Sequence, residues 1–167
     1  MYEIIRQRIM VLDGAMGTMI QRYAPQEADY RGTRFAHVSV PQRGNNDLLT
    51  LTRPDIIADI HRKYLEAGAD IIETNTFSAQ RISMADYGLD DICPELNREA
   101  ARLARRLADE FSSADKPRFV AGSMGPTNKT CSMSPDAADP ALRVLTYDDL
   151  FEAYEEQATA LLEGGVD

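Results

Sequence analysis

A short pattern occurs twice in the chain and constrains the fold more than any other feature. The first copy is Leu65-Glu66-Ala67-Gly68-Ala69-Asp70, and the second is Leu162-Glu163-Gly164-Gly165-Val166-Asp167. Each copy ends a segment with a helical apolar stripe, and each contains a glycine where helix ends favour one. After the first copy comes the apolar pair Ile71-Ile72, which is typical of a buried strand. The repeat predicts alternating helices and strands, with a further strand expected after Asp167.

Three apolar runs are expected to form strands, at residues 9–12, 70–74 and 118–123. Helices are expected at 18–23, at 54–67 with Thr52 as the cap, at 94–111, and from Thr146, whose capping-box partner is Asp149. Alternating strands and helices form right-handed units around a parallel sheet. We therefore expect an α/β fold, an incomplete (β/α)8 TIM barrel made of the first three β/α units with long strand-end loops. A complete, small three-stranded α/β fold is the alternative, and the long loops favour the barrel.

Composition narrows the class of protein. Hydrophobic residues make up 44% and charged residues 27%, as in ordinary globular domains. Residues 1–167 are expected to be the N-terminal part of one barrel domain, truncated before the fourth strand. The net charge of −9 disfavours nucleic acid as a partner. No apolar run approaches the ~20 residues that span a bilayer, and the N-terminus has no signal-peptide core, so we expect a cytoplasmic protein without a membrane partner.

The loop after the first expected strand predicts an amino-acid site. In parallel barrels the loops at strand ends build the active site. The Asp13 carboxylate would attract a cation, and free backbone N–H groups of Gly14 and Ala15 would attract an anion. An ammonium and a carboxylate on one small molecule describe an amino acid. In the alternative, Asp13 only caps the following helix and the glycines only form the turn.

The loops after the other two strands supply further candidates. Asn75 and Thr76 follow the second strand and Asn128 follows the third, so all three are predicted to line the substrate site. The alternatives are that Asn75 only fixes its loop by hydrogen bonds, and that the loop before Asn128 is a plain turn. Cys93 is expected to be a small buried group, and Cys131 a thiol without a catalytic role, because no partner base is evident. The cysteines and histidines are too scattered to predict a metal site within this chain.

Taken in order, several motifs resemble the N-terminal part of the homocysteine-binding domain of cobalamin-dependent methionine synthase. Each motif is weak alone, but their order is specific from Ile9 to Asp167. The segment 31–47 favours this family over the homocysteine methyltransferases that use betaine or methylmethionine. The motifs are residues 12–21, Glu27-Ala28-Asp29-Tyr30-Arg31-Gly32, Gly44-Asn45-Asn46-Asp47-Leu48-Leu49, residues 67–77, Met84-Ala85-Asp86-Tyr87 and Gly125-Pro126-Thr127-Asn128.

The resemblance implies that the complete enzyme transfers a methyl group from methylcobalamin to the zinc-activated thiol of homocysteine, giving methionine. It implies zinc and cobalamin as cofactors. The three zinc cysteines and an ammonium-binding glutamate are expected on later strands, outside this chain. Asp13 is expected to hold the substrate ammonium, and the backbone of Gly14 and Ala15 its carboxylate.

The resemblance also implies partners. These are homocysteine, the downstream half of the barrel, and folate- and cobalamin-binding modules of the same protein. By itself the chain is expected to be inactive and to self-associate through its uncovered sheet. The alternatives are another homocysteine S-methyltransferase of the same barrel family, and a non-catalytic module that binds an amino acid or a protein partner.

Overall fold

The sheet consists of two parallel strands with a single bridge at one edge. The computed structural model describes the backbone of residues 1–167 and all side chains except that of Tyr2. Strand β1 (Ile71–Glu73) pairs with β2 (Phe119–Ala121) in the register Ile71 with Phe119 and Glu73 with Ala121. Leu12 forms one parallel bridge to Ile71. The spatial order is therefore Leu12, β1, β2.

The prediction of a first strand at residues 9–12 is wrong in extent. Val11 accepts hydrogen bonds from the backbone N–H groups of Asp70 and Ile71, and Asp13 donates to Ile71. Ile9 is 87% exposed and Leu12 47%, so little packs against this segment to extend the ladder. With two strands and a bridge among the described residues, the structure shows an α/β arrangement, and the expected three-strand part of a barrel is not itself seen.

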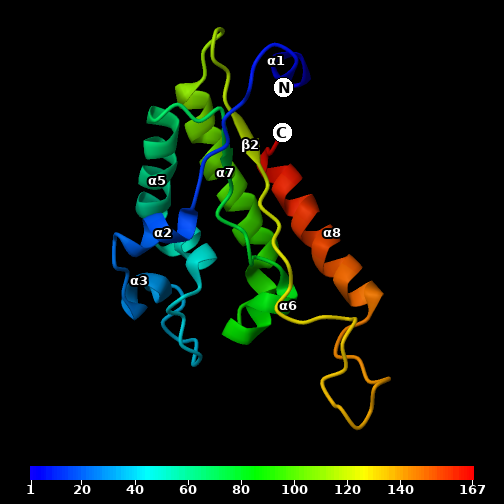
Figure 1. The fold of residues 1–167 in the computed structure, drawn as a ribbon. Coiled ribbons are helices and arrows are strands. Elements are labelled where there is room, and N and C mark those ends of the chain that lie inside the picture. The colour runs from blue at the N-terminus through cyan, green and yellow to red at the C-terminus, as the bar shows by residue number, and fades with distance from the viewer.

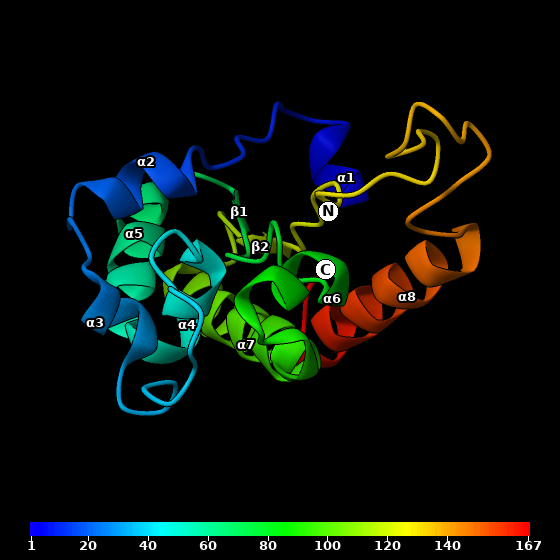
Figure 2. The same ribbon diagram turned by 90° about the horizontal axis from the view of Figure 1, so that it is seen from below.

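Three long helices pack in a row on one side of the strands (Figures 1 and 2). They are α5 (Pro54–Glu66), α7 (Cys93–Phe111) and α8 (Tyr147–Gly164). Central helix α7 packs against both of the others. The close contact between α7 and α8 depends on Gly164, since a Cβ there would lie 2.4 Å from the Cβ of Ala101. The helices thus form one layer and the strands the other.

The helix ends test the predicted caps. The capping box of α8 is confirmed, because Thr146 Oγ1 accepts the Asp149 N–H at 3.1 Å and Asp149 Oδ2 accepts the Thr146 N–H at 2.7 Å. Thr52 does not cap α5. It ends a separate short helix, α4 (Leu49–Thr52), and its hydroxyl donates to the Leu48 carbonyl. The N-cap of α5 is Arg53, which makes no side-chain capping bond.

Shorter elements fill the connections. Helix α2 (Met16–Gln21) begins before the expected residue 18, and segment 122–146 contains no helix or strand. The other short helices are α1 (Tyr2–Ile5), α3 (Glu27–Arg31), η1 (Asn46–Leu48), α6 (Arg81–Met84), η2 (Ala85–Tyr87) and η3 (Asp90–Ile92). In the chain as described, no helix is both long and apolar enough to cross a membrane.

Two apolar clusters support these layers. The larger lies between the strands and helices α5 and α7, and contains Ile57, Ile60, Ile72, Leu107 and Val120. The smaller joins segment 35–48 to α6 and to the start of α7, and contains Phe35, Leu48, Met84, Cys93 and Leu96. Cys93 is buried, as predicted. The second cluster holds segments 45–48 and 77–84 at the carboxyl end of β1, where the polar residues gather.

Candidate functional site

Asp13 lies at the carboxyl end of β1. Its Oδ2 atom accepts the backbone N–H of Glu73 at 3.0 Å, while its Oδ1 atom is buried with no hydrogen-bond partner among the described residues. Burial raises the pKa of Asp13 to about 7, against the opposing effect of the Glu73 hydrogen bond. The capping alternative is wrong, since the N-cap of α2 is Ala15, without a side-chain capping bond. Asp13 therefore presents one carboxylate oxygen that the protein does not use.

That carboxylate belongs to a cavity of about 300 Å³ at the carboxyl edge of the strands. Asp13, Gly14 and Ala15 form one wall, and Asn75 and Thr76 belong to the facing loop. The backbone N–H groups of Gly14 and Ala15 donate no hydrogen bond to another described residue. The structure thus brings five of the six predicted site residues to one cavity, with an unused anionic oxygen beside unused N–H donors.

Asn75 and Thr76 also fix the loops that carry them. Asn75 Nδ2 donates to the Asn46 carbonyl at 2.9 Å and to Thr50 Oγ1 at 3.2 Å. Thr76 Oγ1 donates to the Ser123 carbonyl at 2.7 Å and lies 2.6 Å from Thr74 Oγ1. The structure therefore supports the loop-fixing alternative for Asn75, although its amide oxygen accepts no bond from the described residues.

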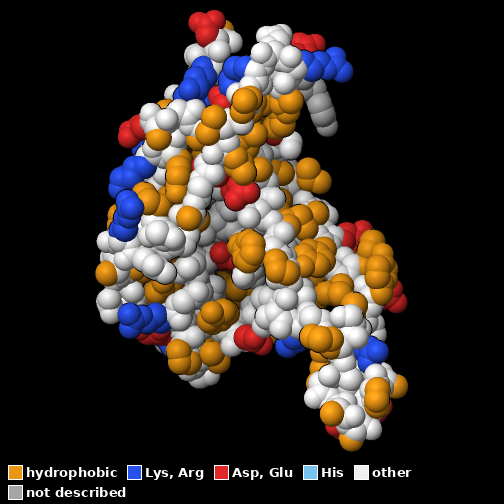
Figure 3. All heavy atoms as spheres, in the orientation of Figure 1, with side chains coloured by type: hydrophobic (Ala, Val, Ile, Leu, Met, Phe, Trp, Pro, Cys, Tyr) orange, Lys and Arg blue, Asp and Glu red, His pale blue; other side chains and the backbone are white. Residues whose placement is uncertain are grey.

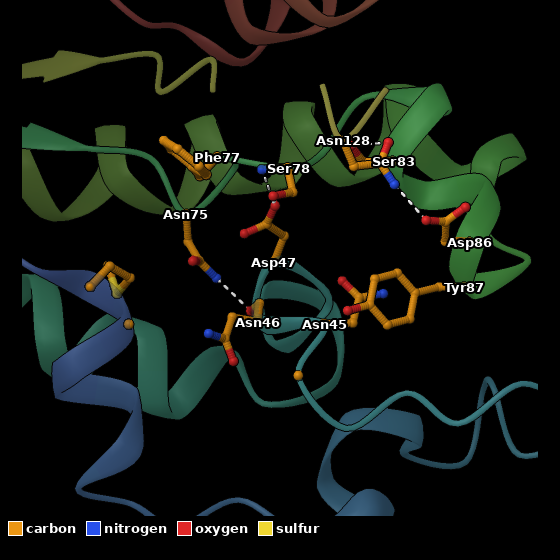
Figure 4. A pocket seen from close by; sticks show the side chains of 13 residues that line it. Asn45, Asn46, Asp47, Asn75, Phe77, Ser78, Ser83, Asp86, Tyr87 and Asn128 are labelled. Carbon is orange, nitrogen blue, oxygen red and sulfur yellow. Dashed lines mark hydrogen bonds between the residues drawn. The ribbon is translucent and has the colours of Figure 1, made fainter. Parts of the chain in front are cut away.

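Asn128, the sixth predicted residue, lines a neighbouring cavity of about 420 Å³ (Figure 4). Its side-chain nitrogen donates to Asp86, and its oxygen accepts the Ser83 hydroxyl at 3.3 Å. The loop before it passes close to the second strand-end loop, because the Gly125 N–H donates to the Phe77 carbonyl and a Cβ on Gly125 would lie 2.6 Å from that oxygen. The two cavities share the wall residues Met16, Gly17, Asn75 and Phe77.

Asp47 is a site residue that sequence reasoning missed. It is 5% exposed and lines the larger cavity, and its Oδ2 atom accepts the Ser78 N–H at 2.7 Å. Burial raises the pKa of Asp47 to about 7. The sequence signal for Asp47 was its place directly before the apolar pair Leu48-Leu49, which is buried. An acid in such a segment is seldom buried unless it has a partner, so it is a candidate for binding a ligand.

The residues of this chain do not fit the zinc centre that the resemblance implies. Zinc binds thiolates, but Cys93 is buried in the smaller apolar cluster, and burial raises the pKa of its thiol to about 12. Cys131 is a free, partly exposed thiol in segment 122–146. Across the described residues, no three His, Cys, Asp or Glu side chains gather in a way that could hold a metal ion.

Comparison with known proteins identifies the family. Residues 10–167 match the family model for homocysteine S-methyltransferase. This chain belongs to the homocysteine S-methyltransferase family. The family-level part of the sequence resemblance is therefore confirmed.

Solved structures of a homocysteine methyltransferase share the fold. The metallated form of MmuM from Escherichia coli matches with a TM-score of 0.71 and 20% identity, over 99% of this chain and 54% of that one. The oxidized form matches with a TM-score of 0.68 and 23% identity, over 95% of this chain and 51% of that one. The chain thus spans about half the length of these structures, and at such identity the likeness is one of fold.

Proposed function

We propose that this chain forms the amino-acid-binding part of a homocysteine S-methyltransferase, in which the whole enzyme transfers a methyl group to the homocysteine thiol. The observation that carries the proposal is the buried, unpartnered Oδ1 of Asp13 in a cavity that also contains Gly14 and Ala15. The ammonium of homocysteine would donate to Asp13, and the backbone N–H groups of Gly14 and Ala15 would donate to its carboxylate. The bound ammonium would favour the ionised form of Asp13.

The finer parts of the proposal come from the sequence resemblance. We propose methylcobalamin as the methyl donor and methionine as the product, with folate- and cobalamin-binding modules and the remaining part of the barrel as partners, in a cytoplasmic enzyme. Zinc supplies thiol activation in such a protein when it is bound. Because the residues present here do not fit a zinc centre, this chain contributes substrate binding and no step of thiol activation.

The test compares homocysteine with 4-mercaptobutanoate, which lacks only the amino group. Calorimetric titration of the chain should show that Asp13→Asn weakens homocysteine binding by about ten- to a hundredfold, because a charge-assisted hydrogen bond contributes about 1.5–3 kcal/mol. Binding of 4-mercaptobutanoate should be unchanged. The matched control is Asp115→Asn, an exposed aspartate outside the cavity.

Two results would contradict the proposal. One is unchanged affinity of the Asp13→Asn variant for homocysteine, which would leave Asp13 with only its bond to Glu73. The other is no binding of homocysteine to the chain at millimolar concentration.

A further inference from the structure

The larger cavity contains a carboxylate that the protein uses only in part. Asp47 gives one oxygen to the Ser78 N–H, and its other oxygen receives no hydrogen bond from the described residues. Asp47 also makes no ion pair among them, and Lys129 pairs with Asp86 at 3.7 Å. An asparagine would accept the Ser78 N–H equally well, so holding the loop does not require a buried charge here.

Two buried amides leave further acceptors at the same cavity. Asn75 commits its nitrogen to the Asn46 carbonyl and Thr50, and Asn45 commits its nitrogen to Gln42 Oε1 at 3.2 Å. Asn45 and Asn75 are 4% and 5% exposed. Asn75 uses both N–H groups of its amide and Asn45 uses one of its two, while neither amide oxygen accepts a hydrogen bond from the described residues. In Figure 4, Asp47 projects between Asn75 and Ser78, while Asn45 lies beside Tyr87.

The rest of the cavity wall is partly apolar and carries two further titratable side chains, Tyr87 and Asp86. Phe77 and Met16 supply apolar surface, and Tyr87 lies close enough to Asp47 that the carboxylate charge adds to the burial that raises the pKa of this phenol. The other titratable group of the wall is Asp86, which carries negative charge as well. The wall has two acids and neither Lys nor Arg, and its Asn46 Nδ2 and Tyr87 hydroxyl donate no hydrogen bond to the described residues. Positive charge is therefore the feature that a ligand for this cavity should bring.

We propose that the cavity lined by Asp47, Asn45 and Asn75 is a second binding site, for a small organic molecule that enters it through a protonated primary amine. A primary ammonium brings positive charge and three N–H donors to a wall on which one Asp47 oxygen and the Asn45 and Asn75 amide oxygens accept no hydrogen bond from the described residues. The cavity of about 420 Å³ is of the size that small-molecule sites have. This site adjoins the Asp13 cavity but does not use Asp13, so it stands independently of the proposed function.

The probe is n-propylammonium chloride, titrated into the ¹⁵N-labelled chain at pH 8 and constant ionic strength. The backbone signals of Asp47, Leu48, Ser78 and Tyr87 should move saturably. The neutral n-propanol should bind at least tenfold more weakly, because it brings a single donor and no charge. This comparison uses the unaltered chain, so it tests the preference for a charged amine even where a variant fails to fold.

Variants locate the site. Asp47→Asn keeps an acceptor for the Ser78 N–H and should weaken propylammonium binding at least tenfold, whereas Asp115→Asn should change it less than twofold. In Asp13→Asn the signals of Leu48 and Ser78 should still move, while any response at Gly14 and Glu73 is lost. The proposal is overturned by equal affinity for n-propanol, by an Asp47→Asn variant that binds normally, or by calcium chloride moving the same signals at lower concentration, which would mean a site for a hard cation.

Discussion

Asp167 and Val120 are joined by a reciprocal pair of hydrogen bonds. The Asp167 N–H donates to the Val120 carbonyl at 2.9 Å, and the Val120 N–H donates to Asp167 Oδ2 at 2.8 Å. Asp70 and Val11 make the same pair, at 2.7 Å and 2.9 Å. In both copies of the repeat, a glycine at positive φ ends the helix, and the aspartate that follows bonds to the preceding strand segment. The sequence repeat is therefore a structural repeat.

The first prediction concerns the stability that Asp70 contributes. Its side chain is buried and accepts both the Val11 N–H and a bidentate bond from Arg8 at 2.8 Å. Asp70→Asn should lower the free energy of unfolding by about 1–3 kcal/mol at pH 7, measured by urea titration. Asp115→Asn should change it by less than about 0.5 kcal/mol.

The bonds that Asp70 accepts from Arg8 and Val11 also predict how the stability difference between wild type and Asp70→Asn depends on pH. The hydrogen bond from Arg8, and then that from Val11, hold the pKa of Asp70 at about 2, below its usual 3.8. A lowered pKa in the folded state stabilises the fold above the unfolded value and loses this effect as pH falls through the folded value. The advantage of wild type over Asp70→Asn should thus shrink between about pH 4 and 2. A difference that stays constant over this range would contradict the assignment.

The second prediction concerns His61, which is fully buried in α5 with both ring nitrogens unpartnered among the described residues. Burial lowers its pKa from 6.5 to about 4. The unfolded chain therefore binds the proton more tightly, and His61 destabilises the fold as pH falls below about 6.5. The stability of His61→Leu relative to wild type should rise by about 1.4 kcal/mol per pH unit down to about pH 4.

Urea titrations at several pH values between 7 and 4.5 would measure this trend. The matched control is His37→Leu, since His37 is exposed. A His61→Leu variant whose relative stability does not vary with pH would show that the folded chain holds the protonated ring as readily as the unfolded chain does.

Local signals made part of this fold predictable, and contacts between distant segments decided the rest. The α8 capping box and the turn glycines of the repeat act within a few residues, so the sequence located them. Whether residues 9–12 form a strand depends on what packs against Ile9, which no local pattern contains. The prediction that Thr52 caps α5 was wrong because α4 ends at Thr52, directly before α5 begins at Pro54. The apolar pattern of the sequence does not separate two helices that follow each other so closely.

The residues of the candidate site also fall into those that local sequence patterns predicted and one that they did not. The sequence predicted that Asp13, Asn75 and Asn128 lie near one another because each follows an apolar run, and strand ends meet at one edge of a parallel sheet. The structure places them on two adjoining cavities. Asp47 was missed because its segment has no period, and its burial arises from the Ser78 loop and the smaller apolar cluster, which come from more distant parts of the chain.

The third prediction separates the two thiols. Cys93 is 1% exposed with a pKa raised to about 12, so little of it is the reactive thiolate at pH 8. Cys131 is partly exposed. A chromogenic disulfide reagent should modify one thiol rapidly in the native chain and two in urea. Cys131→Ser should remove the rapid phase and Cys93→Ser should leave it. Two rapid equivalents in the native chain would mean that the α7 start opens readily.

The last prediction arises from apolar side chains on the strand side of the molecule. Ile9, Val11, Leu12, Phe77 and Met124 are 41–87% exposed, and the face turned to the viewer in Figure 3 carries apolar patches. The helices cover the opposite side of the strands (Figure 2). Covering one large apolar side chain contributes about 1.5–3 kcal/mol, so covering several approaches the ~5–15 kcal/mol that stabilises a whole domain.

We therefore expect the chain to self-associate through this face. The net charge of −9 opposes association, but exposed charges are screened beyond about 8 Å at physiological salt, while apolar contact is not. Light scattering across a dilution series should show a mass above that of one chain, and Ile9→Lys should shift the equilibrium toward the monomer. Met133→Lys, which alters another exposed apolar side chain, in segment 122–146, should not. A monomer at every concentration, with a cooperative unfolding transition and no binding of hydrophobic dye, would mean that the strand side needs no cover, because the two apolar clusters alone then stabilise the chain.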